Sequence, residues 1–165
     1  MGSNDTSKVF STVREILELP KGSDSWDLMQ ENYVEFLSDD DVTYSWEAFS
    51  ENHDFPALRI EQENLSASWE LLGKNENLQL LGDREDCFRE IVCLSKLVNP
   101  KFELKYCMDT WHSSERYYVL LSTEQWAELN QLYGKEHVSY RFMYIPESAE
   151  QFIEIAFTEE NQREY

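Results

Sequence analysis

The chain has few glycines, and they are widely spaced. Five of its 165 residues are glycine, and at least eight other residues separate each glycine from the next. A P-loop and a dinucleotide-binding fingerprint both need clustered glycines, because the backbone must approach a phosphate group closely. The spacing therefore excludes nucleotide binding through either of these two motifs.

Cysteines and long apolar runs are also scarce. The three cysteines, Cys87, Cys93 and Cys107, are odd in number and form no C-x-x-C pair. We therefore expect three free thiols without a catalytic role, in a reducing compartment. The longest strongly apolar run, Tyr117 to Leu121, is far shorter than a membrane span. Together these features predict a cytoplasmic protein without a transmembrane helix.

Basic residues are missing from one long stretch. Between Gly22 and Leu58 there is no lysine or arginine, in a chain whose formal net charge is −19. Nucleic-acid phosphates and anionic membrane surfaces are bound by clustered Lys and Arg. The charge therefore argues against direct binding to nucleic acid or to an anionic membrane. The acidic residues of this stretch are Asp24, Asp27, Glu31, Glu35, Asp39, Asp40, Asp41, Glu47, Glu51 and Asp54.

The same stretch is rich in aromatic residues, among them Trp26, Tyr33, Phe36 and Phe55. Disordered acidic segments contain few aromatic residues, so we expect this stretch to fold. A local excess of one charge repels itself and costs stability unless a cationic partner offsets it. The combination predicts a folded acidic surface that binds a positively charged partner. The alternative is a solvated face that keeps the protein soluble.

Hydrophobic periodicity predicts a single α+β domain over 1–165, with a mainly antiparallel sheet and about three to four helices. Its ends, 1–5 and 159–165, are expected to be frayed. The expected helices cover 6–19, 25–37, 83–98 and 123–133. The expected strands cover 42–48, 58–60, 65–71, 102–108, 116–121, 138–144 and 153–157, and 65–72 also fits a helix.

Two of the expected helices have specific sequence signals. Asp83 is a candidate cap for the helix over 83–98, which we expect to pack across the sheet through one apolar face. That face contains Cys87, Phe88, Ile91 and Val92. Ser122 and Gln125 form a capping-box pattern at the start of the helix over 123–133.

The sequence contains no catalytic or cofactor motif, and we expect neither a cofactor nor a metal. Asp39-Asp40-Asp41 is the best candidate for a hard cation, but it lacks the spacing of an EF-hand loop and is expected to form a solvated turn. His112 lies near Cys107 and Glu115 in the sequence. Neither a complete zinc ligand set nor a catalytic base with an orienting acid accompanies it.

We expect partner binding through six carboxylates and one aromatic anchor, Tyr44 or Trp46. On a strand over 42–48, Tyr44 and Trp46 share one face and Phe49 lies on the other. Attraction between these carboxylates and a cationic partner accelerates association. Reversing the charge of Asp39 and Asp41 is therefore expected to slow association and to leave the fold intact. The six carboxylates are those of Asp39, Asp40, Asp41, Glu47, Glu51 and Asp54.

In size, acidity and lack of catalytic motifs, the chain resembles the immunity proteins that bacteria pair with secreted nuclease toxins. The resemblance rests on these general properties and on no alignable motif. It implies a stoichiometric binding protein that blocks a basic protein partner, a toxin or nuclease. Two alternatives stay open: a phage- or plasmid-type DNA mimic that inhibits a nucleic-acid-binding protein, and a small hydrolase with an acidic site that no motif marks.

Overall fold

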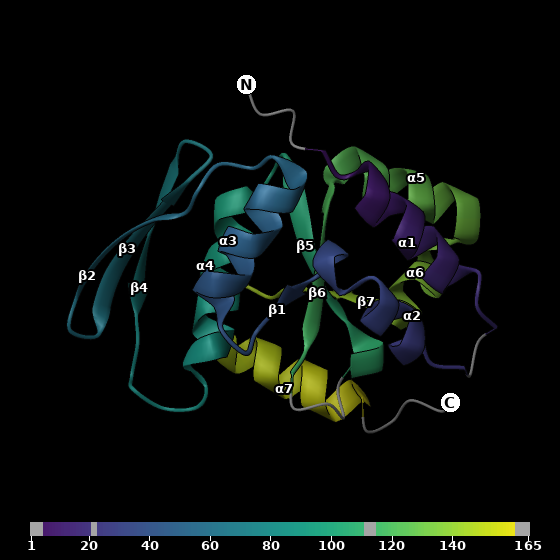
Figure 1. Cartoon of the computed structure of the whole chain (residues 1–165). Helices are drawn as coiled ribbons and strands as arrows, with labels where there is room; N and C mark the ends of the chain where they lie inside the picture. The colour runs from purple at the N-terminus through teal and green to yellow at the C-terminus, as the bar shows by residue number, and fades with distance from the viewer. Residues whose placement is uncertain (1–4, 21–22, 111–114, 161–165) are drawn as a thin grey trace.

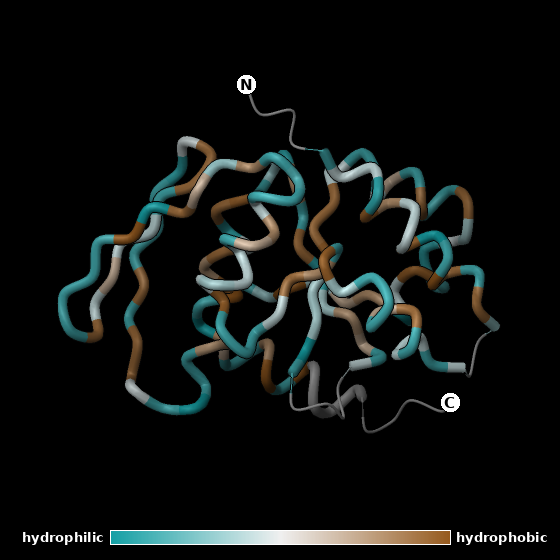
Figure 2. Tube along the Cα trace, viewed as in Figure 1, coloured by the Kyte–Doolittle hydropathy of each residue, from teal (hydrophilic) through white to brown (hydrophobic). Residues whose placement is uncertain are grey.

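The computed structural model describes residues 5–20, 23–110 and 115–160, and this part of the chain contains seven α-helices and two antiparallel sheets (Figure 1). The α+β class is therefore confirmed, and the number of helices is higher than predicted. Figure 2 shows hydrophobic stretches along the central strands and alternating hydrophobic and hydrophilic residues along the helices. None of the described helices is long and apolar enough to span a lipid bilayer.

The larger sheet has the strand order β1-β6-β5-β7 and forms the centre of the molecule. The residues of β6 from Tyr117 to Leu121 are all buried, which explains why this strand reads as a continuous apolar run. Neighbouring strands in this sheet are antiparallel. Its strands are β1 (Leu37–Ser38), β5 (Phe102–Cys107), β6 (Tyr117–Ser122) and β7 (Phe142–Tyr144).

The smaller sheet is a three-stranded meander with the order β2-β3-β4. Ala67, Trp69 and Leu71 of β3 are buried and alternate with partly or fully exposed residues, so one face of the sheet packs on the core. The turn from β3 to β4 has positive φ at Leu72 and Gly73, as the tightest hairpin turns require. Its strands are β2 (Arg59–Glu63), β3 (Ser66–Leu71) and β4 (Lys74–Gln79).

The helices fill the space between the sheets and cover the larger one. Helix α4 contacts β5 of the larger sheet and both β3 and β4 of the smaller one, and α3 packs against α4 and β1. In Figure 1, α1, α5 and α6 lie on the opposite side of the larger sheet from α3 and α4. The α-helices are α1 (Ser7–Leu17), α2 (Trp26–Glu31), α3 (Val42–His53), α4 (Asp86–Val98), α5 (Thr123–Tyr133), α6 (Lys135–Arg141) and α7 (Ala149–Glu160), and the 3-10 helices are η1 (Tyr33–Glu35) and η2 (Met108–Thr110).

The strand predicted over 42–48 is wrong, because these residues begin helix α3. Val42, Trp46, Phe49 and His53 are all buried, and their spacing of four, three and four residues is that of one helical face. Asp41 caps this helix by accepting a hydrogen bond from the Tyr44 N–H at 3.2 Å. Trp46 and Phe49 therefore share one face, and Tyr44 lies on another.

Other predicted elements also change. Residues 138–144 are mostly helix α6 followed by the short strand β7, and 153–157 lie in helix α7. Both segments alternate apolar and polar residues over too few positions to separate a strand from a helix. The helix predicted over 25–37 divides into α2, η1 and β1. Of the ends expected to be frayed, Asp5 donates its N–H to the His53 carbonyl oxygen at 2.8 Å and 159–160 belong to helix α7, and 1–4 and 161–165 lie outside the described residues.

The predicted packing of α4 is largely confirmed. Phe88, Ile91 and Val92 are buried, and Cys87 is half-buried. The helix begins at Asp86, and Asp83 is not its N-cap. The Lys74 ammonium of β4 donates hydrogen bonds to the carbonyl oxygens of Lys96 and Asn99, at 2.6 and 2.9 Å. A cation at the negative end of the helix dipole stabilises it, so this contact also fastens the smaller sheet to α4.

One ion pair is completely enclosed. Arg141 of α6 and Asp109 of η2 are both 0% exposed and pair with each other. Asp109 also accepts hydrogen bonds from the Ser25 N–H and hydroxyl, and Arg141 donates to the carbonyl oxygens of Pro20 and Ser23. Because buried charges are tolerated only when paired and hydrogen-bonded, this cluster fixes the segment before α2 against α6.

Candidate functional site

The structure separates the ten acidic residues of the basic-free stretch into two groups. Glu35 and Asp39 are buried, and the other eight are exposed. Glu35 pairs with the buried ring of His53, with 3.3 Å between Oε2 and Nε2. Only the exposed carboxylates are placed to meet a partner.

Asp39 is part of the core and not of a solvated turn, so the prediction for this residue is wrong. Its carboxylate accepts hydrogen bonds from the Arg116 N–H at 3.2 Å, the Arg116 Nε at 2.7 Å and the Tyr118 hydroxyl at 2.9 Å. Burial raises the pKa of Tyr118 well above its usual value, and the Asp39 charge raises it further. Asp39 is therefore committed to the fold, and the expectation that its charge can be reversed without damage is withdrawn.

Asp40 and Asp41 have different surroundings, although both are exposed. The Asp40 N–H donates to the Ser38 hydroxyl at 3.1 Å, and Asp41 caps α3. The charge of Asp41 also affects the pKa of Glu90 in α4. Burial, with smaller contributions from Asp41 and Asp86, raises the pKa of Glu90 to about 7. The three consecutive aspartates thus do not converge, and the described residues contain no group of three or more His, Cys, Asp or Glu that could hold a metal ion.

Five of the predicted residues line one groove. Tyr44, Glu47 and Glu51 follow one another at intervals of three and four residues, so they form a stripe on the solvent side of α3. Asp54, at the C-cap with φ of 61°, continues the stripe. The groove has a volume of about 770 Å³ and lies between this stripe and the start of β2. It is lined by Thr43, Tyr44, Trp46, Glu47, Ser50, Glu51, Asp54, Phe55, Ala57, Leu58 and Ile60.

The two candidate aromatic anchors behave differently. The Trp46 side chain is 1% exposed, and its indole N–H donates to the Pro56 carbonyl oxygen at 3.0 Å. Its ring also contacts Phe55 edge to face, with 5.6 Å between centroids. Tyr44, by contrast, is 69% exposed. Trp46 therefore forms the floor of the groove, and Tyr44 is the side chain free to contact a partner.

The charge of the groove is one-sided. Glu47, Glu51 and Asp54 contribute carboxylates, and no Lys or Arg belongs to the lining. Within the described residues, no ion pair joins Glu47 or Glu51 to a base. The opposite wall is apolar, with Leu58 and the 38%-exposed Ile60. Such a groove suits a segment that is cationic along one side and apolar along the other.

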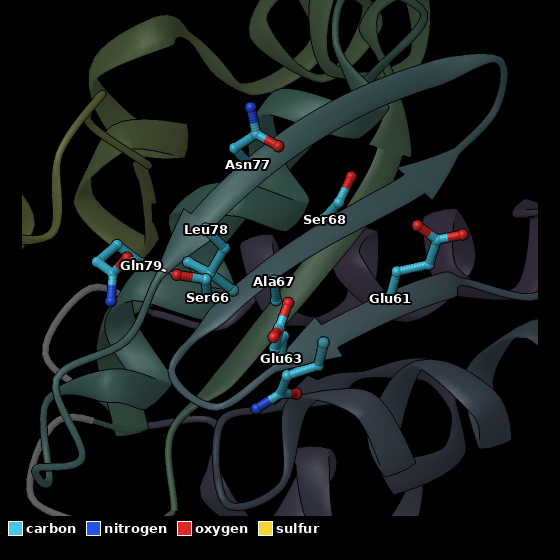
Figure 3. A pocket seen from close by; sticks show the side chains of 9 residues that line it. Glu61, Glu63, Ser66, Ala67, Ser68, Asn77, Leu78 and Gln79 are labelled. Atoms are coloured by element: carbon cyan, nitrogen blue, oxygen red, sulfur yellow. Dashed lines mark hydrogen bonds between the residues drawn. The ribbon is translucent and has the colours of Figure 1, made fainter.

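A second acidic area lies on the smaller sheet, outside the groove. A hollow of about 650 Å³ lies there. Figure 3 shows Glu61 and Glu63 of β2 on the same side as the serine hydroxyl groups of β3. Ser66 donates a hydrogen bond to the Gln79 side chain across the sheet at 2.9 Å. The nearest base in sequence, Arg59, is engaged by Glu70 at 3.5 Å. The lining consists of Glu61, Gln62, Glu63, Ser66, Ala67, Ser68, Asn77, Leu78 and Gln79.

The sequence prediction missed the second wall of the groove, formed by Ala57, Leu58 and Ile60. This wall depends on how the chain turns after α3, which local patterns do not encode. A signal for the first wall was present: Val42, Trp46, Phe49 and His53 have helical spacing, and a helix there would have placed Tyr44, Glu47 and Glu51 on one stripe.

The thiols of Cys87 and Cys93 are poorly suited to nucleophilic catalysis. All three cysteines are free thiols, as predicted. Burial, followed by the charge of Asp39, raises the pKa of the Cys87 thiol to about 11, and burial raises that of Cys93 to about 12. A thiol with a raised pKa is a poor nucleophile at neutral pH. The pairing of Cys107 with His112 is untested, because His112 lies outside the described residues.

No family model, curated protein or solved structure matches the chain. The chemistry of the groove and of the acidic face of the smaller sheet is therefore the basis for a proposed function.

Proposed function

We propose that the protein is a stoichiometric inhibitor that docks on a basic surface of a partner protein through the α3–β2 groove, as an immunity protein blocks a nuclease-type toxin. The observation that carries the proposal is the groove itself. It combines exposed Glu47 and Glu51 on one helical stripe with the exposed ring of Tyr44, and no base belongs to its lining.

The acidic groove is complementary in charge to a basic partner. A nuclease must present positive charge to bind its polyanionic substrate, so carboxylates can occupy the same surface. Complementary charge also accelerates association, which matters for an inhibitor that must intercept a toxin before it acts. An exposed tyrosine next to these charges supplies the aromatic contact that interface hot spots favour.

One observation also favours the DNA-mimic alternative. Glu61 and Glu63 place further negative charge on the smaller sheet, outside the groove, so the anionic surface is not limited to one helix. Under this alternative, the partner is a nucleic-acid-binding protein of a host cell and not a paired toxin. Both versions require binding to a basic protein, and the identity of the captured partner separates them.

The test uses two charge-reversal variants with the same helical spacing. Glu47→Lys with Glu51→Lys changes the groove, and Glu124→Lys with Glu128→Lys changes the exposed side of α5 by the same charge. The parent and both variants are used to capture partners from extracts of the native host, and association rates with the purified partner are measured at several salt concentrations.

We expect the groove variant to associate about tenfold or more slowly than the parent, with a flatter salt dependence, since steering charges act mainly on the association rate. The α5 variant should stay within about threefold of the parent, because its change lies outside the proposed interface. Equal slowing by both variants would mean that only net charge matters, and a nonbasic partner would also contradict the proposal.

A further inference from the structure

Strand β2 is an open edge of the smaller sheet. In the described part of the chain, β3 is its sole strand neighbour, and all five residues of β2 are exposed. An open edge presents unpaired backbone N–H and C=O groups, which is why exposed edges pair with other chains. The register of the β2–β3 hairpin determines which residues carry these groups.

The hairpin between β2 and β3 has a defined hydrogen-bonding pattern. Glu63 pairs with Ser66 across a two-residue loop, in which Asn64 has φ of 58°. The pair that closes such a loop is hydrogen-bonded, and opposite residues in an antiparallel ladder then alternate between bonded and non-bonded pairs. The backbone groups of Arg59, Glu61 and Glu63 therefore face β3. Those of Ile60 and Gln62 face the open edge.

The two faces of this edge differ in chemistry. Ile60 and Gln62 lie opposite Trp69 and Ala67, which are buried, so they belong to the face of the sheet that packs on the core. Glu61 and Glu63 belong to the other face. The groove is lined by Leu58 and Ile60 but by no residue of β3 or β4, so it lies beside β2 and toward α3. A strand added to this edge would lie over the groove.

We propose that the partner contributes an extended basic segment, which adds to β2 as a fourth strand of the smaller sheet. This inference rests on the proposed function and specifies how the partner binds. Side chains on one side of the added strand would cover Ile60 and extend their charged ends toward Glu47 and Glu51. Those on the other side would lie next to Glu61 and Glu63.

Charge selects this occupant over a second copy of the chain. Two copies paired through β2 would bring their own Glu61 and Glu63 side chains together, and like charges on adjacent strands destabilise pairing. Charged residues on an edge strand are a known protection against such self-association. The same residues attract a strand that carries Lys or Arg. The edge therefore disfavours pairing between two copies of the chain and favours pairing with a basic segment.

The inference can be tested with a short fluorescent peptide that alternates lysine and valine. Two further versions carry backbone N-methyl groups, one on the lysines and the other on the valines. In a strand these two sets of N–H groups face opposite edges. If the peptide adds to β2, one methylated version should lose about tenfold or more in affinity, as the loss of edge hydrogen bonds implies. The other version should bind about as well as the unmodified peptide.

Hydrogen exchange gives a second, independent measurement on the protein. The amides of Ile60 and Gln62 should exchange at least about tenfold more slowly when the peptide is bound, since hydrogen-bonded amides exchange only on opening. A matched pair of variants tests the same edge: Gln62→Pro removes the outward N–H, and Gln62→Thr retains it. Only the proline variant should lose peptide binding, because proline at an edge position leaves the bonds to β3 in place.

Three results would contradict strand addition at β2. Equal affinity of both methylated peptides, together with unchanged exchange at Ile60 and Gln62, would overturn strand addition, as would absence of any peptide binding. Protection of these two amides by self-association of the protein would assign the edge to a second copy and also overturn it. None of these results affects the kinetic test with the native partner, so strand addition can fail while the proposed function stands. If the proline variant does not fold, the methylated peptides still give the answer.

Discussion

Asp39 and Glu47 belong to the same acidic stretch, but they lie in opposite environments. Asp39 is buried and receives hydrogen bonds from Arg116 and Tyr118, whereas Glu47 is exposed in a groove whose lining contains no base. The buried carboxylate stabilises the fold only together with partners that are distant in sequence. The exposed carboxylate adds to self-repulsion and contributes nothing visible to packing. Acidic residues with structural roles can therefore be told apart from those available for binding by what surrounds them.

The largest effect is expected from the most enclosed carboxylate. Asp109→Ala would leave the Arg141 guanidinium buried without its counter-charge, and removing one partner of a buried ion pair costs about 3–5 kcal/mol. Urea unfolding followed by circular dichroism measures this loss. Asp109→Leu with Arg141→Met should recover much of it, because an apolar pair leaves no isolated charge. A loss below about 1 kcal/mol for the single variant would contradict the structural role of this pair.

Asp39→Asn should have a smaller but clear effect. The substitution keeps the shape of the side chain but weakens its bonds with Arg116 and Tyr118, and charge-assisted hydrogen bonds contribute about 1.5–3 kcal/mol each. We expect a loss of about 2 kcal/mol in the free energy of unfolding. The matched control is Asp40→Asn at the exposed neighbouring position, which should be nearly neutral. Similar losses for both variants would remove the distinction between buried and exposed carboxylates.

Glu90 of α4 is half-buried, between the buried Asp39 and the exposed Glu47, and its effect on the free energy of unfolding depends on pH. Because its pKa rises from 4.5 to about 7 in the folded state, the folded protein binds more protons than the unfolded chain between these values. The contribution of Glu90 to stability is therefore present below about pH 4.5 and is lost as the pH rises through about 7. Glu90→Gln should be more stable than the parent at alkaline pH, by about 1 kcal/mol after allowance for solvent screening.

The measurement is chemical unfolding of the parent and Glu90→Gln over a pH series. The stability difference should shrink as the pH falls from about 7 to about 4.5 and should be small at lower pH, where the carboxyl is protonated in both states. A difference that stays constant with pH would show that the substitution acts through packing and not through ionisation.

The smallest change in stability is expected at the groove. Glu47→Gln with Glu51→Gln should alter the free energy of unfolding by no more than about 0.5 kcal/mol, because surface substitutions away from structural contacts are usually near neutral. Any change should be toward greater stability, since two like charges on one helical stripe are removed. Thermal unfolding checks this, with Glu124→Gln and Glu128→Gln as the control on α5. A large loss would mean that the groove carboxylates serve the fold.

Part of the fold was predictable because some local signals act without help from distant residues. The apolar face of α4, the continuous apolar run of β6 and the capping box of Ser122 and Gln125 are all present as predicted. These signals are long or chemically specific. The alternation over 42–48 was neither, and four positions fitted a strand while the longer pattern to His53 fitted a helix.

The candidate site was predictable in composition but not in shape. The excess of acid and the aromatic residues pointed to Tyr44, Glu47, Glu51 and Asp54, which the structure brings to one groove. The burial of Asp39 could not be inferred, because its partner Arg116 is 77 residues away in the sequence. Pairing across the sheet depends on tertiary structure, so charge patterns alone do not reveal which acidic residues are already neutralised.

The position of Trp46 gives the groove an intrinsic optical reporter. Indole emission responds to nearby charge and to loss of water, and this ring forms the groove floor with its N–H held by the Pro56 carbonyl. Of the other four tryptophans, Trp26, Trp69 and Trp126 do not belong to the groove lining and Trp111 lies outside the described residues, so the spectrum of Trp46→Phe supplies their combined background. Subtracting the spectrum of Trp46→Phe would isolate the signal of the groove, and occupancy could then be followed in real time on the unlabelled protein.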